Sequence, residues 1–423
     1  MRDGGRIAAA IEVLGEIEAR HLPAHLALRR WGEGARYAGA KDRAFVSGLV
    51  LDALRRRRSA GWMMADESDR ARALGVLRFV WDWPVEWLAA AAEETHGPGA
   101  LTDVERAHLA GPVSLDDAPP PIRGDYPDWL DASLARVLGE DRAMEGQALA
   151  ARAPVDVRIN SLKRDAGHVL KALAPFGAEP LAFPAGAIRI AAPAASERAA
   201  PVEAAPAFEK GWFEVQDAGS QVAAAVAGEI KGRQVLDFCA GGGGKTLALA
   251  AAMGNTGQLY AYDSDARRLA DTVRRTQRAG VRNLQVRSPI DPKALEGLDG
   301  RMDLVFVDAP CTGSGTWRRH PDAKWRLSPE QLERRIAEQD AVLAAAAAFV
   351  KPGGRLVYVT CSLLAEENED RVAAFVAAHP AFAPTPIELE GADAWRTPDG
   401  YLRLTPRTAG TDGFFVAALM QRK

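Results

Sequence analysis

Cysteine is scarce in this sequence. The chain of 423 residues contains three cysteines, Cys239, Cys311 and Cys361, and no two of them form a CxxC pair. A disulfide framework or a cysteine-rich zinc site needs more cysteines at closer spacing. We therefore expect reduced thiols and no bound metal.

Long apolar runs and a strong net charge are also missing. The apolar stretch 342–350 is too short to span a bilayer, and Glu12, Glu16 and Glu18 interrupt the N-terminal region where a signal peptide would be apolar. The 53 basic and 56 acidic residues give a net charge of −3, so the overall charge does not indicate a nucleic-acid partner. We expect a soluble, cytoplasmic protein in which any nucleic-acid contact depends on local basic patches.

The composition and length predict several globular domains. Hydrophobic residues make up 48% of the chain and charged residues 26%, which is ordinary for globular proteins, and the length favours two or three domains. Apolar residues recur at helical spacing through 1–115, which predicts an all-α domain. The proline- and aspartate-rich stretch 116–127 predicts an extended linker, and the mixed patterns in 128–213 predict a small α+β module.

Residues 214–423 alternate short apolar runs with turns and helical stretches. The runs VLDF, LYAYD, LVFVD and RLVYVT have the length and composition of buried strands. Their alternation with helices predicts an α/β fold with a doubly wound, mostly parallel sheet, and the run FFVAALM at 414–420 would be its edge strand. Ligands bind such sheets beyond the carboxyl ends of the strands.

The first of these strands runs into a glycine-rich turn that is a candidate cofactor site. Glycine lets the backbone approach a ligand closely. A phosphate-binding P-loop would need glycine at position 239, where this chain has cysteine. A dinucleotide site stays open, because Asp263 after the second strand could hold the ribose of either kind of cofactor or could cap the next helix. The candidate loop residues are Cys239, Ala240, Gly241, Gly242, Gly243, Gly244 and Lys245.

Two later strands bring cysteines to the same end of the predicted sheet. Cys311 follows Asp308 in VDAPC, and Cys361 follows the strand that ends in VT. Carbon 5 of cytosine is a weak nucleophile, but a thiolate added at C6 creates an enamine whose C5 can attack a sulfonium methyl group. The scheme needs a nucleophile, a group at N3 and a group that assists elimination, and Asp308 with the two cysteines fits this count. These residues alone leave open which cysteine attacks, whereas Cys239 fits a small buried hydrophobe.

The motifs together resemble a known family. LDFCAGGGGKT, YAYD, VDAPCTGSGTWRRHPD and VTCSLLAEENE occur in this order over about residues 210–420. They resemble the RsmB/Sun branch of RNA cytosine-C5 methyltransferases, a group that includes the eukaryotic NSUN enzymes. The resemblance implies a Rossmann-like class I methyltransferase domain that uses S-adenosylmethionine. It also implies that Cys361 is the nucleophile, that Cys311 assists product release, and that Asp308 lies between cofactor and base.

The resemblance further assigns parts of the cofactor. The loop would surround its methionine part, Asp263 would hold its ribose, and Asp291 is the candidate for its adenine. The family loop has alanine and proline where this chain has Gly241 and Gly242, so we expect a more flexible loop that still binds.

The upstream sequence also resembles this family. Arg158 and Asn160 lie in VRINSLK, which resembles the RNA-facing module that precedes the catalytic domain. Residues 1–115 resemble the NusB-like RNA-binding domain of the RsmB branch. The basic run 55–58 is either a phosphate contact of that domain or a solvated helix end.

Aromatic and basic residues follow the Pro-Cys motif. Trp317 and Trp325 either stack on nucleotides that flank an unpaired or flipped cytosine, or pack locally. We expect RNA contacts from Arg318, Arg319 and His320. The expected substrate is small-subunit ribosomal RNA, with transfer RNA as the alternative, and the expected state is a monomer. An amino-group methyltransferase and a non-catalytic RNA-binding assembly factor are the competing functions.

Overall fold

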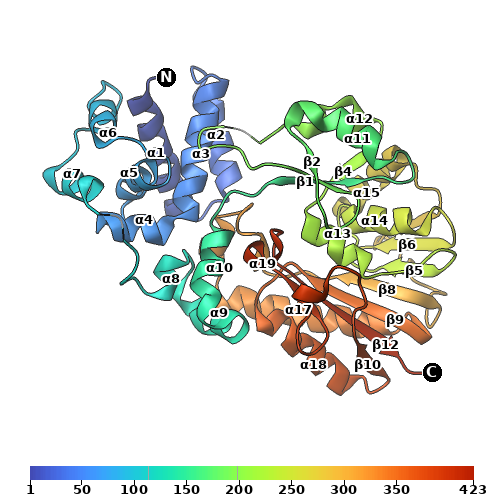
Figure 1. The fold of residues 1–423 in the computed structure, drawn as a ribbon. Helices are drawn as coiled ribbons and strands as arrows, with labels where there is room; N and C mark the ends of the chain where they lie inside the picture. The colour runs from blue at the N-terminus through green and yellow to red at the C-terminus, as the bar shows by residue number, and fades with distance from the viewer. Residues whose placement is uncertain (113, 198) are drawn as a thin grey trace. The chain divides into compact units, whose positions relative to one another are not determined.

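The computed structural model describes residues 1–112, 114–197 and 199–423, and its contacts divide the chain into two compact units (Figure 1). The first unit comprises Met1–Ala153, Ala192–Ala199 and Trp317–Leu327. The second unit comprises Pro154–Ala191, Ala200–Thr316 and Ser328–Lys423.

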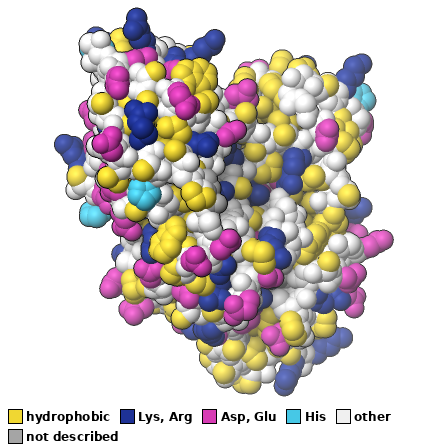
Figure 2. All heavy atoms as spheres, turned by 60° about the vertical axis from the view of Figure 1, so that its left-hand side comes forward, with side chains coloured by type: hydrophobic (Ala, Val, Ile, Leu, Met, Phe, Trp, Pro, Cys, Tyr) yellow, Lys and Arg dark blue, Asp and Glu magenta, His cyan; other side chains and the backbone are white. Residues whose placement is uncertain are grey.

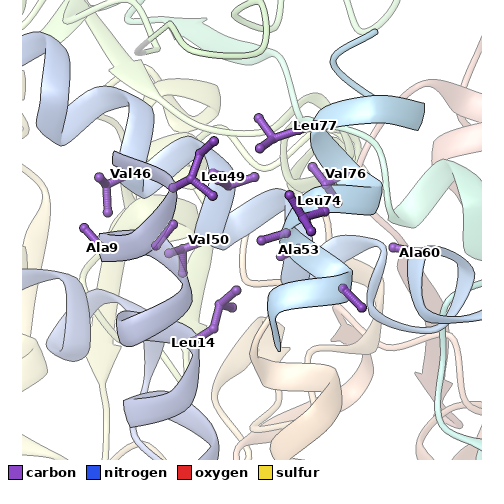
Figure 3. Packing of buried hydrophobic residues seen from close by; sticks show 14 of the residues in the cluster. Ala9, Leu14, Val46, Leu49, Val50, Ala53, Ala60, Leu74, Val76 and Leu77 are labelled. Carbon is purple, nitrogen blue, oxygen red and sulfur yellow. The ribbon is translucent and has the colours of Figure 1, made fainter. Parts of the chain in front are cut away.

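The described residues of the first unit form helices and no strand. Its core lies where α1, α3 and α5 meet, and Figure 3 shows Leu49 and Val50 of α3 gathered there with Leu74 of α5. These three side chains have no exposed surface, so the apolar stripes of the helices stabilise the unit by burial. The helices are α1 (Asp3–Arg20), α2 (Ala24–Gly34), α3 (Ala40–Arg55), α4 (Arg57–Met64), α5 (Asp69–Phe79), α6 (Val85–Ala92), α7 (Asp103–Ala110), α8 (Pro120–Arg123), α9 (Asp131–Leu138), α10 (Arg142–Leu149) and α16 (Ala323–Arg326).

The stretch 116–127 differs from the extended linker that its composition predicts. It contains the short helix α8 and two fully buried residues, Asp125 and Tyr126. The Asp125 carboxylate accepts hydrogen bonds from the backbone N–H groups of Arg58 (3.0 Å) and Ser59 (2.9 Å), which lie in the first turn of α4 and have no partner within the helix. Helices α9 and α10, expected in the second module, also belong to the first unit.

The second unit begins with a small antiparallel sheet in the strand order β2-β3-β1-β4. Val157 of β1 and Val169 of α11 are buried in its separate hydrophobic cluster. The elements are β1 (Val155–Ile159), α11 (Ala166–Leu173), β2 (Glu179–Pro180), β3 (Ala187–Ile190), α12 (Pro206–Glu209) and β4 (Phe213–Val215).

The larger sheet of the second unit has eight strands in the order β10-β12-β9-β8-β5-β6-β7, with β11 paired to β12. Strands β7, β6, β5, β8 and β9 are mutually parallel, as Figure 1 also shows for the arrows of β5, β8 and β9. The predicted doubly wound, Rossmann-like α/β fold is therefore confirmed. The strands are β5 (Gln234–Asp237), β6 (Gln258–Tyr262), β7 (Leu284–Arg287), β8 (Met302–Asp308), β9 (Val350–Thr360), β10 (Phe382–Thr385), β11 (Leu402–Leu404) and β12 (Phe414–Gln421).

Helices cover both faces of this sheet. Val222 of α13 and Leu249 of α14 pack on one face, and Leu343 of α17 and Phe375 of α18 pack on the other. Burial on both faces explains why the strands read as continuous apolar runs and not as alternating ones. The helices are α13 (Ala218–Ala225), α14 (Gly244–Met253), α15 (Ala266–Ala279), α17 (Pro329–Ala347), α18 (Glu369–Ala378) and α19 (Pro406–Ala409).

The prediction that 414–420 forms an edge strand is wrong. Strand β12 pairs antiparallel with β9 on one side and with β10 and β11 on the other. Its residues Phe414–Leu419 are all buried, which is the pattern of a strand inside a sheet. An edge strand would leave one row of backbone groups unpaired.

The surface agrees with the near-neutral composition. On the face drawn in Figure 2, basic and acidic side chains are intermingled. In the described part of the chain, no helix combines the length and the apolar character needed to cross a membrane.

Candidate active site

A cavity of about 610 Å³ opens at the carboxyl ends of β5, β6, β8 and β9. Its volume falls in the usual range of small-molecule sites. Parallel strands place the residues that follow them at one edge of the sheet, so the motifs meet there although they are distant in sequence. The predicted residues that line it are Cys239, Ala240, Gly241, Gly242, Gly244, Lys245, Asp263, Asp308, Cys311 and Cys361.

The glycine-rich loop uses backbone angles that other residues rarely adopt. Gly241 and Gly243 have φ angles of 53° and 82°, and a Cβ at Gly243 would lie 2.9 Å from Thr272 Oγ1. Asp263 Oδ2 accepts a hydrogen bond of 2.8 Å from the Gly241 N–H, so the candidate ribose ligand also holds the loop. Gly243 does not line the cavity and instead turns the chain into α14.

Asp237, the last residue of β5, is a buried carboxyl group beneath this loop that sequence analysis missed. Its side chain is fully buried, Thr246 Oγ1 donates to its Oδ2 over 2.6 Å, and its Oδ1 has no hydrogen-bond partner. Burial raises the pKa of Asp237 to about 7, and the Asp308 and Asp263 carboxylates add to this effect. The detectable signal was a charged residue inside the otherwise apolar run VLDF.

Lys245 and Asp308 form an ion pair in the cavity, with 2.7 Å between Nζ and Oδ2. The Lys245 side chain is nearly buried, whereas the Asp308 side chain keeps 31% of its surface exposed. Burial alone would lower the pKa of Lys245, but the attraction of Asp308 outweighs it and the pKa is raised. The lysine therefore stays charged beside a carboxylate that remains accessible from the cavity.

Cys311 and Cys361 face each other, with 3.3 Å between their sulfur atoms. The backbone joins their loops as well, because the Gly315 N–H donates to the Cys361 carbonyl over 2.9 Å. The hydrogen bond with Cys361 raises the pKa of the Cys311 thiol well above its usual range, and burial adds to the shift. Cys239 also lines the cavity, and burial raises the pKa of its thiol well above the usual value. The three thiols therefore differ in environment, and only two of them touch.

Glu367 holds the Pro-Cys loop from below. Its carboxylate accepts hydrogen bonds from Thr312, through both the backbone N–H and the hydroxyl, and from Gln339 Nε2. Its side chain is fully buried, and burial raises its pKa. The sequence contained the signal in the run AEENE, but only the fold shows what this carboxylate contacts.

The cavity wall contains further residues that sequence analysis did not select. Tyr262, which ends β6, stacks on Phe238 with 5.3 Å between ring centroids. Gln216 and Arg275 line the wall near the glycine loop. Tyr262 belongs to the YAYD motif but was not singled out, whereas Arg275 on α15 reaches the cavity only through the fold.

Asp291, predicted for the adenine, does not line the cavity. Its carboxylate accepts a hydrogen bond of 2.9 Å from the Lys293 N–H in the loop after β7.

Asn160, predicted to bind RNA, is instead buried and saturated with hydrogen bonds. Its Nδ2 donates to the carbonyls of Gly211 (2.8 Å) and Ala279 (2.9 Å), and its Oδ1 accepts from Leu162. Only 3% of its surface is exposed, so this side chain joins segments of the second unit. Arg158 Nε likewise donates to Gln216 Oε1 over 2.7 Å, and burial lowers the pKa of Arg158 to about 10.

The segment after the Pro-Cys motif packs within the first unit. Trp317 is 1% exposed, which favours local packing over stacking on nucleotides, the two alternatives that the sequence left open. Trp325 Nε1 donates to the Leu54 carbonyl over 2.6 Å, which supports local packing. Arg318 is also buried, whereas His320 is exposed and Arg319 is half-buried. Most of the side chains that we considered for RNA contacts therefore pack within the protein instead.

The basic run 55–58 is engaged by acidic partners. Arg55 pairs with Asp52, Arg56 with Asp125, Arg57 with Glu18 and Arg58 with Asp128. These ion pairs favour the structural interpretation of the run. Among the described residues, no three or more His, Cys, Asp or Glu side chains form a group that could hold a metal ion.

The fold and this cavity define a methyltransferase of the Rossmann-like, S-adenosylmethionine-dependent class. Residues 226–420 match the family model of the 16S rRNA methyltransferase RsmB/F. A probable ribosomal RNA small subunit methyltransferase B of Synechocystis sp. is 31% identical over 336 residues, which are 76% of this chain and 73% of that protein. The chain belongs to the RsmB/F family, which confirms the family predicted from the motifs.

Two further comparisons agree with this assignment. The ribosomal RNA small subunit methyltransferase B of Cronobacter sakazakii is 34% identical over 300 residues, which are 70% of this chain and 66% of that protein. The crystal structure of PH0851 superposes with a TM-score of 0.73 at 25% identity and covers 100% of this chain and 99% of that one.

Proposed function

We propose that this chain transfers a methyl group from S-adenosylmethionine to C5 of a cytosine in small-subunit ribosomal RNA, through a covalent bond between Cys361 Sγ and C6 of the base. The contact of 3.3 Å between the sulfur atoms of Cys311 and Cys361, beside a glycine-rich cofactor loop, carries this proposal. Methylation of an amino group would need neither cysteine. The names of the relatives support ribosomal RNA as the substrate.

The cavity residues fit S-adenosylmethionine. The loop presents backbone to the cavity at Gly241 and Gly242, and it leads into the N-terminus of α14. We assign the methionine part to this loop and the ribose to Asp263, which is 5% exposed and lines the wall. The bound cofactor supplies a methyl group on a sulfonium centre. Asp291 stays a candidate for the adenine end only if its loop rearranges.

The two cysteines have different roles in this scheme. The hydrogen bond with Cys361 and burial raise the pKa of the Cys311 thiol, which supports Cys311 as the partner that assists release, and we assign Cys361 as the nucleophile. The Cys361 thiolate adds to C6, and the electron pair moves to C5, which then takes the methyl group. The C5 proton then passes to water, and its bonding electrons re-form the C5–C6 double bond as the C6–S bond breaks, which expels Cys361 and restores the aromatic ring. Cys311 is placed to return a proton to the departing sulfur.

Asp308 is placed to orient the base. As the ionised partner of Lys245 it accepts hydrogen bonds, and the exocyclic amine of cytosine is a donor. The ion pair with Lys245 Nζ holds this carboxylate in place beside the cavity. The target cytosine must leave a base stack to reach the cavity, so an unpaired or flipped nucleotide is the substrate.

The remaining assignments concern the RNA and the state of the protein. Arg319 and His320 keep accessible surface and are our candidates for contacts with the flanking nucleotides, and Arg318 and Arg158 would contact RNA only after local rearrangement. We keep the monomer as the proposed state, because the residues that line the cavity include both cysteines, Asp308 and the glycine-rich loop. An rRNA substrate places the reaction in the cytoplasm.

A methyl-transfer assay tests this function. The protein is incubated with tritium-labelled S-adenosylmethionine and either deproteinised small-subunit rRNA or transfer RNA, and the modified nucleoside is identified by mass spectrometry. We expect 5-methylcytosine in the rRNA. An N-methylated nucleoside, or labelling that survives replacement of both Cys311 and Cys361 by alanine, would overturn the proposal, and 5-methylcytosine in transfer RNA alone would move the substrate to that RNA.

A further inference from the structure

The cofactor loop is held by side chains from outside it. Between Gly241 and Gly244 the loop has no side chain, and glycine loses more conformational freedom on ordering than any other residue. Asp263 binds the Gly241 N–H, and Thr272 Oγ1 donates to the Gly241 carbonyl over 2.9 Å. The next carbonyl, that of Gly242, accepts a hydrogen bond of 2.6 Å from Arg275 Nη1. These three hydrogen bonds clamp the loop, and two of them come from side chains of α15.

Arg275 is itself fixed by a buried carboxylate. Its Nη2 and Nε donate to Oε2 of Glu214, over 3.0 Å and 3.3 Å. Glu214 lies on β4 and is 2% exposed, and Arg278 also donates to it. The planar guanidinium group thus bridges a strand of the small sheet and the cofactor loop, with separate N–H groups for each.

We propose that Arg275 is a positioning residue for the cofactor: it fixes the Gly242 carbonyl, and with it the loop, in the conformation that receives S-adenosylmethionine. Glu214 orients Arg275 for this task. The inference rests on the proposed cofactor but assigns a role to a residue that no motif indicated. It also explains how a loop with glycine at 241 and 242 stays ordered without the alanine and proline expected there.

Loss of this clamp has a specific physical consequence. Without the guanidinium group, the Gly242 carbonyl loses a charge-assisted hydrogen bond, while Glu214 keeps Arg278 as its partner. The loop then samples more conformations before binding, and only the competent fraction takes the cofactor. Loss of a hydrogen bond to a charged group typically changes an equilibrium constant by a factor of about 10 or more. We therefore expect Arg275→Ala to raise the Kd for S-adenosylmethionine about tenfold.

The neighbouring Arg274 provides a matched control. Its side chain is 80% exposed and pairs with Asp271 on the same helix, so Arg274→Ala removes an equal charge without touching the loop. The two variants and the unmutated chain are compared by calorimetric titration with S-adenosylmethionine in the absence of RNA. Arg275→Lys keeps the charge but cannot reach both partners. Its Kd should therefore lie between those of the unmutated chain and Arg275→Ala.

A second change distinguishes positioning from direct contact. Gly242 lies outside the positive-φ region, and a Cβ there would meet only Arg275 Nη1, at 3.7 Å. Gly242→Ala therefore fits the loop and restricts its unfolded conformations. In the Arg275→Ala background it should recover about two- to fivefold in affinity, a gain typical of such stiffening. A direct contact between Arg275 and the cofactor would not be restored in this way.

Hydrogen exchange of the cofactor-free protein completes the test. We expect the backbone amides of 241–244 to exchange faster in Arg275→Ala and at the unmutated rate in Arg274→Ala. Unchanged exchange together with an unchanged Kd would overturn the role of Arg275, as would a failure of Gly242→Ala to recover affinity. If the unmutated chain binds no S-adenosylmethionine, the proposed function fails, and the exchange rates still decide whether Arg275 orders the loop.

Discussion

The sulfur atoms of Cys311 and Cys361 lie 3.3 Å apart although 50 positions separate the two residues in sequence. The parallel pairing of β8 with β9 produces this contact, because each cysteine comes directly after its strand or a few residues beyond it. The pair is asymmetric, since the hydrogen bond and burial raise the pKa of Cys311. The two thiols are close enough to act on the same base, and the family resemblance assigns the attack to Cys361.

Replacing each cysteine in turn distinguishes the nucleophile from the cysteine that assists product release. We expect Cys311→Ala, incubated with S-adenosylmethionine and small-subunit rRNA, to accumulate a protein–RNA adduct that survives denaturation, because elimination lacks its proton source. Cys361→Ala should form no adduct and transfer no methyl group. Denaturing electrophoresis with labelled RNA measures both. Cys239→Ala is the control that keeps both paired thiols and should accumulate no adduct, and the opposite pattern for the two paired cysteines would exchange their roles.

Asp308→Asn tests the ion pair in the cavity. The amide cannot neutralise Lys245, which is then buried without a counter-ion, and it presents a weaker acceptor to the cytosine amine. We expect the single-turnover rate of methyl transfer to fall by about 100-fold or more, the usual scale for loss of a catalytic acid–base or electrostatic group.

Asp303→Asn is the matched control for Asp308. Asp303 lies near the opposite end of the same strand, where its carboxylate binds Arg233, Lys351 and the Gln234 N–H. Its loss should lower stability and leave the rate unchanged. Equal losses of rate in the two variants would show that any damage to β8 reduces activity, and would remove the special role of Asp308.

Asn160→Ala tests whether this residue binds RNA or holds the fold. Because its amide satisfies two buried carbonyls, we expect the free energy of unfolding to fall by about 1–3 kcal/mol. Ser161→Ala, at the exposed neighbouring position, should leave stability nearly unchanged. Denaturant titration measures the stability, and filter binding measures the RNA affinity. A large loss of RNA affinity at unchanged stability would restore the original prediction for Asn160.

The difference between Asn160 and the cysteines shows how far the sequence could be interpreted. Strands are visible in the sequence as apolar runs, and the point where each run stops marks the end of its strand. Cys311, Cys361 and Asp308 could therefore be placed at one edge of a parallel sheet. A polar residue such as Asn160 looks the same whether it binds RNA or satisfies buried carbonyls, because its partners, Gly211 and Ala279, come from distant segments. Only the tertiary structure separates these two uses.

The same limit explains why the sequence left the use of Trp317 open and did not indicate the role of Arg275. Trp317 follows the Pro-Cys motif, and no pattern in the local sequence shows that it is buried. Arg275 lies on a helix rich in arginine, where Arg274 is exposed and Arg275 reaches the loop. Position along the helix does not show which of two adjacent arginines contacts another element, because the partners lie elsewhere in the sequence.

The buried carboxyl of Asp237 predicts a pH-dependent stability. Its pKa is about 7 in the folded chain and near 3.8 when exposed, so between these values the folded state holds a proton that the unfolded state has lost. Stability therefore decreases as the pH rises from about 4 to about 7, and the full cost persists above it. Asp237→Asn removes the titration and keeps an acceptor for Thr246. Over this pH window the free energy of unfolding of the variant should rise relative to that of the unmutated chain. The gain is at most about 4 kcal/mol for a pKa shift of about 3 units. Thermal unfolding of the cofactor-free proteins between pH 4 and pH 8 measures this gain, and a difference that stays constant with pH would mean that Asp237 has an ordinary pKa.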